Sequence, residues 1–213
     1  MGQAKQFDAP ASRATIEVNG IRLQVREGGT GRPLVVFSAG DEAQIAPLLN
    51  GLAERNHLFA IDVAGAGAMT AHDLTRNLSH GLARLGLESF SVIGVSRGAP
   101  IALGQAIFAP KQIDKLILLS PPPRTAADND LYAGVAKVEA PTLVLVGTRD
   151  RSGSADTARL LREKIGTCHL LLIYDAHEAI TADRPEACLS PIGEFLERGA
   201  EFVVCHESQM LRR

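Results

Sequence analysis

Ser96 lies in a sequence pattern that can turn a serine hydroxyl into a nucleophile. Residues 94–98 read Gly-Val-Ser-Arg-Gly, a G-x-S-x-G pentapeptide that closes the apolar run 90–93 and opens the helical run 99–109. A serine on such a strand-to-helix turn, a nucleophile elbow, has a strained backbone that exposes its Oγ. Gly94 and Gly98 fit this turn because strand and helix approach too closely for Cβ atoms. The pentapeptide alone is a weak signal, but in this context it predicts a catalytic serine.

A serine nucleophile needs a base and an acid. Its hydroxyl must lose a proton to a neutral imidazole, and a carboxylate then fixes the imidazole tautomer and stabilises the cation that forms. His177 follows the apolar run 169–174, and Asp150 follows the run 142–146 past a turn at Gly147. Because ligands of α/β sheets bind outside the carboxyl ends of the strands, a residue such as Asp150 is well placed.

The elements that must position these residues alternate between short apolar runs and helical patterns, which is typical of an α/β sheet. A two-residue hairpin signal, Asn19-Gly20, joins the first two runs, and several later runs are apolar on both faces, as in a helix-covered parallel sheet. The strand-like runs are residues 14–18, 21–26, 34–37, 58–61, 90–94, 115–119, 142–146 and 169–174. Helical spacing of apolar residues marks 45–52, 74–85, 101–107, 155–161 and 187–196, the last with Pro185 at its start. We therefore predict an eight-stranded, mostly parallel sheet with helices on both faces, in one domain over residues 1–213 with a tail at 199–213.

Composition excludes several classes of function. The 213 residues are 46% hydrophobic and carry a formal charge of −2 without a basic block, so we expect no nucleic-acid partner. No apolar run approaches the roughly 20 residues that cross a bilayer, so we expect no membrane partner. The N-terminus lacks an apolar signal core, and three cysteines without CxxC pairs (Cys168, Cys188 and Cys205) suggest reduced, buried thiols. These features predict a cytoplasmic protein and leave its oligomeric state open, a homo-oligomer included.

The chain resembles the α/β-hydrolase superfamily from its hairpin to the helix that ends near Arg198. Residues 62–67, Asp-Val-Ala-Gly-Ala-Gly, are similar to the family's loop after the fourth strand. Residues 140–150, from Ala-Pro-Thr-Leu-Val to Thr-Arg-Asp, are similar to its seventh strand with the acid just beyond. In this family the triad runs Ser, then acid, then His, so the resemblance implies Ser96, Asp150 and His177.

Other acidic residues and histidines compete for these roles. Asp175 is only two residues from His177, a poor geometry for orienting it, and Asp128 or Asp130 is the better runner-up. Asp62 occupies a position that the family uses to hold its loop. The other histidines lie at strand starts, near the second helix or in the tail, and we expect structural or solvated roles for them: His57, His72, His80, His169 and His206.

The predicted oxyanion hole departs from the family pattern. Its two donors in this fold are backbone amides, one after the nucleophile and one in the loop after the third strand. Arg97 fits the first and Gly40, or Ala39, the second. Ser38-Ala39-Gly40 stands where the family commonly has His-Gly and an apolar residue.

The family's helical lid is missing. It usually lies between the sixth and seventh strands, where this chain has only residues 121–141, enough for a loop with one short helix. The lid is therefore minimal or absent, and the open crevice favours hydrolysis over transfer because it excludes water poorly.

These features predict a serine hydrolase, an esterase or thioesterase, that cleaves a small-molecule ester or thioester through an acyl-enzyme on Ser96. We expect no cofactor and no metal ion, since the chain has neither a G-x-x-x-x-G-K phosphate loop nor a second histidine beside His177-Glu178. Two alternatives stay open: an acyltransferase, cyclase or carbon–carbon bond hydrolase on the same triad, and a non-catalytic ligand-binding descendant.

Overall fold

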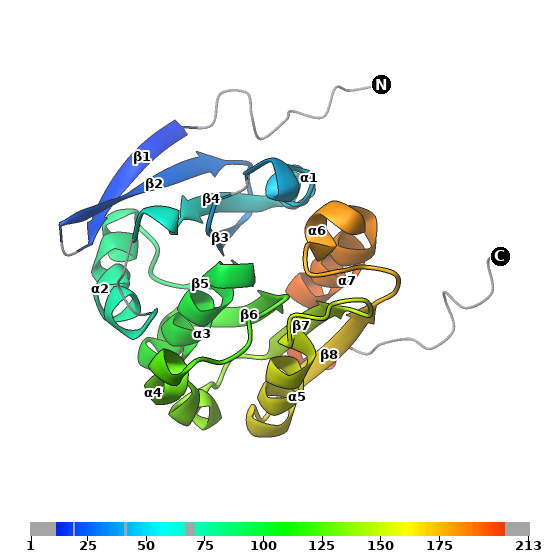
Figure 1. The fold of residues 1–213 in the computed structure, drawn as a ribbon. Helices are drawn as coiled ribbons and strands as arrows, with labels where there is room; N and C mark the ends of the chain where they lie inside the picture. The colour runs from blue at the N-terminus through cyan, green and yellow to red at the C-terminus, as the bar shows by residue number, and fades with distance from the viewer. Residues whose placement is uncertain (1–11, 19, 41, 67–70, 203–213) are drawn as a thin grey trace, which may run out of the picture.

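The computed structural model describes residues 12–18, 20–40, 42–66 and 71–202, which form an eight-stranded sheet flanked by helices (Figure 1). The strand order is β1-β2-β4-β3-β5-β6-β7-β8. The strands are β1 (Ser12–Val18), β2 (Ile21–Gly28), β3 (Arg32–Ser38), β4 (Asn56–Asp62), β5 (Phe90–Val95), β6 (Ile113–Leu119), β7 (Thr142–Gly147) and β8 (Cys168–Ile173). β2 pairs antiparallel with β1 and β4, and every other neighbouring pair is parallel. The predicted sheet is confirmed.

Helices cover both faces of this sheet. They are α1 (Glu42–Ala53), α2 (Ala71–Arg84), α3 (Ala99–Phe108), α4 (Asn129–Ala133), α5 (Ser154–Lys164), α6 (Ile180–Asp183) and α7 (Pro185–Arg198). Helices α2 to α5 bury their apolar side chains in one core cluster, and α1, α6 and α7 bury theirs in a second. Figure 1 shows the two groups on opposite sides of the central strands.

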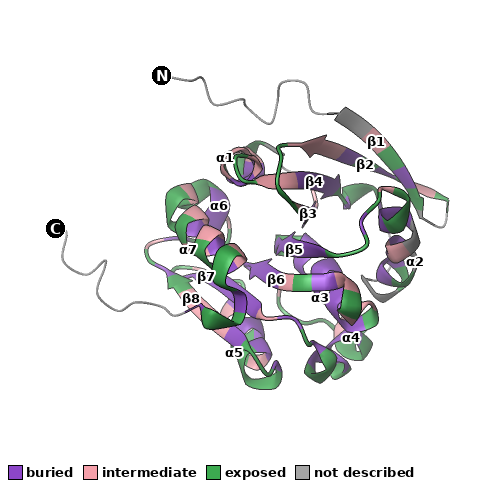
Figure 2. Cartoon of the chain, turned by 180° about the vertical axis from the view of Figure 1, so that it is seen from behind, coloured by how far each residue is buried: buried purple, intermediate pink, exposed green. Residues whose placement is uncertain are grey.

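Burial alternates along the strands as this arrangement requires. Val35 and Phe37 of β3 belong to the first cluster, while Leu34 and Val36 belong to the second. Both sets are fully buried, which explains why the central strands are apolar at every position. In Figure 2 the central strands are buried, and exposed residues gather on the outer surfaces of the helices.

The parallel register brings the carboxyl ends of the central strands to one edge. Val95 at the end of β5 pairs with Leu119 at the end of β6, and Leu119 pairs with Leu145 of β7. The residues that follow these strands, Ser96 and Ser120 among them, therefore lie side by side at this edge.

The segment between β6 and β7 is short, as predicted. It holds α4 and two 3-10 turns, at Ala126–Asp128 and Val135–Lys137. α4 contacts α3 and α2, so it packs beside these helices and not across the carboxyl edge.

Two of the three cysteines are buried free thiols, as the sequence suggests. Burial raises the pKa of Cys168 and of Cys188 to about 12. Asn19, Cys205 and the rest of the predicted tail beyond residue 202 lie outside the described residues. None of the helices in the described ranges combines the length and the apolar character needed to cross a membrane.

Candidate active site

Ser96 occupies the turn between β5 and α3. Its φ is 48°, in the left-handed region that a residue with a Cβ adopts only under strain, and its side chain is exposed. A Cβ on Gly94 would collide with Ala99, and one on Gly98 would collide with the carbonyl group of Phe37 in β3. The backbone conformation and the need for both glycines agree with the sequence prediction for this turn.

The Arg97 amide lies in the first turn of the helical segment that begins at Ser96. A 3-10 turn covers Ser96–Gly98 and runs on into α3. Amides in the first turn of a helix have no acceptor inside the helix, and they carry its partial positive charge. The position suits a donor to an oxyanion formed at Ser96.

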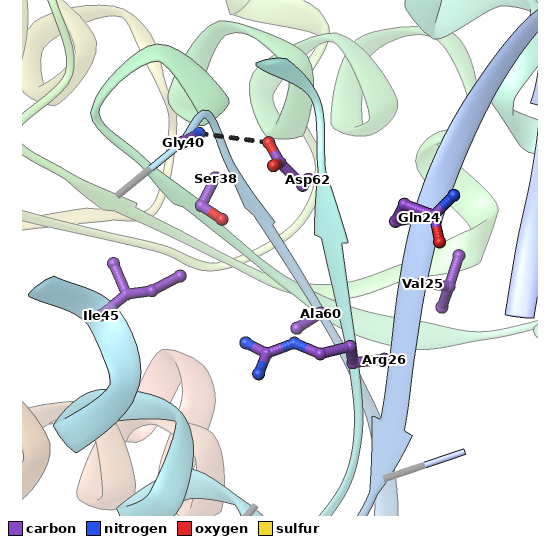
Figure 3. Close-up of a pocket in the computed structure, with 8 residues that line it drawn as sticks. All are labelled: Gln24, Val25, Arg26, Ser38, Gly40, Ile45, Ala60 and Asp62. Carbon is purple, nitrogen blue, oxygen red and sulfur yellow. Dashed lines mark hydrogen bonds between the residues drawn. The ribbon is translucent and has the colours of Figure 1, made fainter. Parts of the chain in front are cut away.

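The loop after β3 is held by two side chains, Asp62, which Figure 3 shows bonded to Gly40, and Arg97. Asp62 Oδ1 accepts hydrogen bonds from the Gly40 amide at 3.1 Å and from the Ala64 amide at 2.8 Å. The Arg97 guanidinium donates to the Ala39 carbonyl at 3.0 Å. Asp62 therefore holds the loop, as the resemblance implies, and the Gly40 amide is engaged with a carboxylate in this arrangement.

The loops that carry Asp150 and His177 are in direct contact. The Arg149 amide donates to the Ala176 carbonyl at 2.9 Å. A Cβ on Gly147 would collide with the carbonyl oxygens of Ala176 and His177, so the two backbones touch there. The structure brings the predicted acid and base into neighbouring loops at the carboxyl edge.

The side chains of Asp150 and His177 form hydrogen bonds with other residues and not with each other. Asp183 Oδ2 accepts from the His177 amide at 2.8 Å and lies 3.2 Å from His177 Nδ1. Asp150 Oδ1 accepts from the Ser152 amide at 2.8 Å, while its Oδ2 is buried without a hydrogen-bond partner among the described residues. Within these ranges no hydrogen bond joins His177 to Asp150 or to Ser96.

Asp183 is the residue at this site that sequence analysis missed. The hydrogen bond from the His177 backbone is the main reason that the pKa of Asp183 is lowered. Because an ionised carboxylate only accepts, Asp183 favours the imidazole tautomer with its proton on Nδ1. That tautomer leaves Nε2 as an acceptor, which is the form a general base needs.

Two of the rival acids, Asp175 and Asp128, have structural partners. Asp175, with φ 59°, forms ion pairs with Arg149 and with Arg184, which ties the loop after β8 to its neighbours. Asp128 accepts from the amide and the hydroxyl of Thr125 and caps a 3-10 turn.

Two other histidines contact partners away from the carboxyl edge. His57 Nε2 lies 2.7 Å from Glu27 Oε1. His169 packs edge-on against Phe195 and Phe202, and burial lowers its pKa.

A cavity of about 380 Å³ lies over Ser96. Its wall combines apolar side chains, such as Ile45 and Ile180, with hydroxyl side chains from several elements. The hydroxyl-bearing residues are Ser38, Ser96, Ser120, Ser152, Ser154 and Thr181. Glu178 lines it too, whereas His177 and Asp150 do not figure among its described lining residues. A second cavity, of about 220 Å³ and lined by Gln24 and Arg26, shares Ser38, Gly40 and Ile45 with the first (Figure 3).

Of the comparisons with known proteins, only the one with solved structures finds similar chains. The chain matches no protein-family model and no curated protein sequence. Among solved structures, a membrane phospholipase A described as a bacterial virulence factor superposes with a TM-score of 0.78 at 18% identity, over 90% of this chain and 87% of that one. The enol-lactonase from Burkholderia xenovorans LB400 gives 0.75 at 19% identity, over 86% of this chain and 100% of that one. The naproxen esterase from Bacillus subtilis gives 0.74 at 13% identity, over 88% and 92%.

The chain has the α/β-hydrolase fold. Within the described part of this α/β-hydrolase fold, the serine turn follows β5, Asp150 follows β7 and His177 follows β8, in the order that the family resemblance implies. The short β6–β7 connection matches the prediction of a minimal lid. At such low sequence identity, the structural similarity shows the fold alone, so the chemistry must be argued from the residues of the site.

Proposed function

We propose that this chain is a serine hydrolase that cleaves a carboxylic ester or thioester through an acyl-enzyme on Ser96. The observation that carries the proposal is Ser96 itself, exposed, strained at φ 48° and facing a cavity at the carboxyl edge of the sheet. The names of the solved structures that share the fold, a phospholipase A, an esterase and an enol-lactonase, also point to ester cleavage.

In this mechanism His177 accepts the proton of Ser96 as Oγ attacks the carbonyl carbon. His177 then returns the proton to the leaving group, and water releases the acid by the same steps. The developing oxyanion binds the Arg97 amide and a second amide from the loop at 39–40. Since the Gly40 amide now donates to Asp62, either it turns to the substrate when the ester binds or Ala39 supplies the second donor.

We further propose that the imidazole changes its hydrogen-bond partner from Asp183 to Asp150. The side chain of His177 is 62% exposed, so its ring has room to turn away from Asp183. The unpartnered Oδ2 of Asp150, in the adjoining loop, is the acceptor that the turned ring would meet. An unpaired buried carboxylate oxygen is costly, and a hydrogen bond from Nδ1 would remove that cost.

A fluorophosphonate probe tests the proposal. We expect it to label Ser96, and we expect p-nitrophenyl acetate to be hydrolysed by the same protein. Ser96→Ala should abolish both, while Ser91→Ala, which removes a buried serine hydroxyl at the amino end of the same strand, should leave both intact. Absence of label and turnover in folded protein would refute the proposal.

The hydrogen bond between His177 and Asp183 favours one alternative, a ligand-binding protein without turnover, because it holds the imidazole away from the predicted triad acid. In that case a ligand would bind over Ser96 equally well in the Ser96→Ala variant, and the wild-type protein would process no ester. An acyltransferase would instead carry the label and give more product when an alcohol or thiol replaces water as acceptor.

A further inference from the structure

A second serine at the carboxyl edge shares the backbone strain of Ser96. Ser120 follows β6 with φ 44°, beside 48° for Ser96. The last paired residues of the two strands are Val95 and Leu119, so Ser96 and Ser120 are the next positions along adjoining strands. Neighbouring strands lie about 4.8 Å apart, which places the two serines one strand spacing from each other.

The Ser120 hydroxyl has no hydrogen-bond partner in the described ranges. The residue is only 4% exposed, it lines the cavity over Ser96, and its Oγ is buried. Its amide is already used, since it donates to the Leu145 carbonyl at 2.8 Å. A buried polar group without a partner is unfavourable, and a non-glycine residue at positive φ adds to that cost. Since Ser120 lines the cavity, a hydrogen bond to a ligand there requires a staggered χ1 position that points the hydroxyl inward.

The rest of the cavity wall suits the same ligand chemistry. Ser154 and Thr181, 2% and 3% exposed, also line it. The hydroxyls of Ser152 and Ser154 lie 2.9 Å apart and can each offer a further hydrogen bond. An alkyl chain buried here would leave the Ser120 hydroxyl without a partner, whereas a polar chain could bond to it and to the paired hydroxyls of Ser152 and Ser154.

We propose that Ser120 is a specificity-determining residue that hydrogen-bonds a hydroxyl or oxo group on the acyl part of the substrate. This inference rests on the proposed acyl-enzyme chemistry at Ser96. The one-strand separation sets the position of the polar group at two to three bonds beyond the carbonyl carbon. The substrate class is therefore a short hydroxyacyl or oxoacyl ester or thioester.

The experiment compares p-nitrophenyl 3-hydroxybutanoate with p-nitrophenyl 3-methylbutanoate, which differ by a hydroxyl in place of a methyl group. We expect wild-type kcat/KM to favour the hydroxy ester about tenfold, the factor that one net hydrogen bond supplies. Ser120→Gly accepts the positive φ and removes the hydroxyl, so the ratio should fall to near one, as it should in Ser120→Ala. Ser91→Ala should keep the wild-type ratio.

A binding measurement separates this inference from the proposed function. In the Ser96→Ala protein, which forms no acyl-enzyme, 3-hydroxybutanamide should bind more tightly than 3-methylbutanamide in an NMR titration, and Ser120→Gly should remove the difference. If the fluorophosphonate labels Ser96 but neither the esters nor the amides are discriminated, the inference on Ser120 is wrong and the hydrolase proposal stands. If Ser96 takes no label while the amides are still discriminated through Ser120, the hydrolase proposal fails and the polar subsite remains.

Discussion

At the scale of single residues, the two carboxylates near His177, those of Asp150 and Asp183, differ in how many of their oxygens accept hydrogen bonds. Asp183 Oδ2 takes both the amide of His177 and its ring Nδ1, while Asp150 keeps one buried oxygen without a partner in the described part of the chain. A triad acid must hold the imidazole when its positive charge forms. We propose that Asp150 performs that task and that Asp183 holds the imidazole in the arrangement described above.

Paired substitutions test this assignment. Asp150→Asn should lower kcat by about 10⁴-fold, because an amide no longer fixes the tautomer or stabilises the imidazolium. Asp183→Asn should change kcat by less than about tenfold, since the side-chain oxygen of the introduced amide can still accept from the His177 amide. Steady-state hydrolysis of p-nitrophenyl acetate measures both. The reverse order of effects would make Asp183 the working acid.

The same residues mark what could be predicted from sequence. The strained turn at Ser96 could be predicted because the pentapeptide joins a strand to a helix, where Gly94 and Gly98 leave no room for a Cβ; the catalytic role of Ser96 stays a prediction. Asp183 left no signal, because a four-residue helix is too short to show periodicity and the hydrogen bond depends on how the loop folds back. The engagement of the Gly40 amide by Asp62 likewise depends on a tertiary contact.

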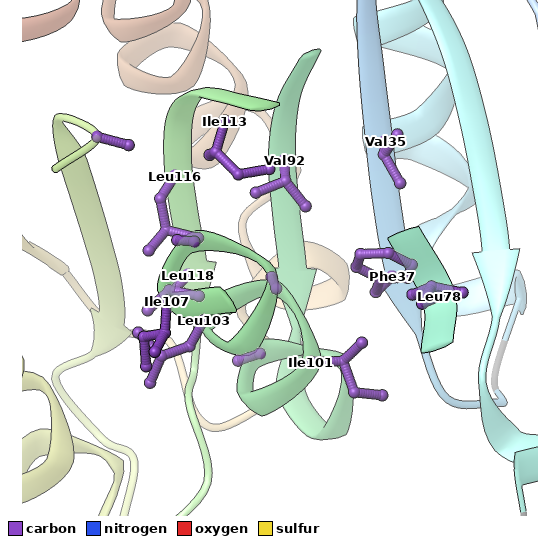
Figure 4. Close-up of a cluster of buried hydrophobic side chains, with 14 of the residues drawn as sticks. Val35, Phe37, Leu78, Val92, Ile101, Leu103, Ile107, Ile113, Leu116 and Leu118 are labelled. Atoms are coloured by element: carbon purple, nitrogen blue, oxygen red, sulfur yellow. The ribbon is translucent and has the colours of Figure 1, made fainter. Parts of the chain in front are cut away.

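At the scale of elements, the serine turn depends on how closely α3 approaches the sheet. Figure 4 shows Leu103 and Ile107 of α3 beside Leu118 of β6, in the core cluster that also contains Ile101 and Val92. At the start of this helix, the Cα of Gly98 faces the backbone of Phe37, with no flexible side chain between them. Backbone atoms of a central strand cannot yield to a methyl group without disturbing the sheet.

Gly98→Ala should therefore lower the free energy of unfolding by about 1–3 kcal/mol, the usual cost of overpacking. Urea denaturation monitored by circular dichroism measures it. Gly193→Ala is the matched control, because Gly193 lies inside α7 with no atom within 4 Å of an added Cβ. That substitution should stabilise the protein by about 0.5–1 kcal/mol. Equal effects at the two positions would contradict the steric argument.

Most elements could be predicted because they are long and regularly patterned. Each of the eight strand-like runs coincides with a strand, and the five predicted helices coincide with α1, α2, α3, α5 and α7. α6 and the 3-10 turns were not predicted, since elements of three or four residues leave no periodic pattern. Pro185 at the start of α7 was predictable, because proline fits a first helical position.

At the scale of the whole molecule, helices cover the two faces of the sheet, and α4, the described helix between β6 and β7, packs against α2 and α3 and not across the carboxyl edge. The minimal lid follows from the length of one connection, because the 22 residues between β6 and β7 (120 to 141) hold only α4 and two 3-10 turns. The site is therefore built from loops that extend the strands themselves. The geometry of the site depends on the stability of the sheet and of the segment 185–202, which contains α7 and packs near the edge strand β8.

The packing of His169 against this segment lets us predict how the free energy of unfolding varies with pH. His169 on the edge strand β8 packs against Phe195 of α7 and Phe202 beyond it, and burial, followed by the charge of Arg162, lowers its pKa from 6.5. The folded state thus binds the proton less readily than the unfolded chain. The stabilising contribution is full above about pH 6.5 and is lost as the pH falls toward the lowered folded value.

His169→Phe removes this titration and keeps a ring in the cluster. We expect the wild-type free energy of unfolding to fall between pH 7.5 and 5.5 more steeply than that of the variant, because only the wild type must protonate an imidazole that the folded state disfavours. Urea titrations at several pH values give the two curves. His57→Phe is the control, since His57 lies at the other end of the sheet with Glu27 as its partner, and it should leave the steeper wild-type slope in place. Parallel curves for the wild type and His169→Phe would mean that the segment 185–202 opens enough in the native state for water to reach the imidazole.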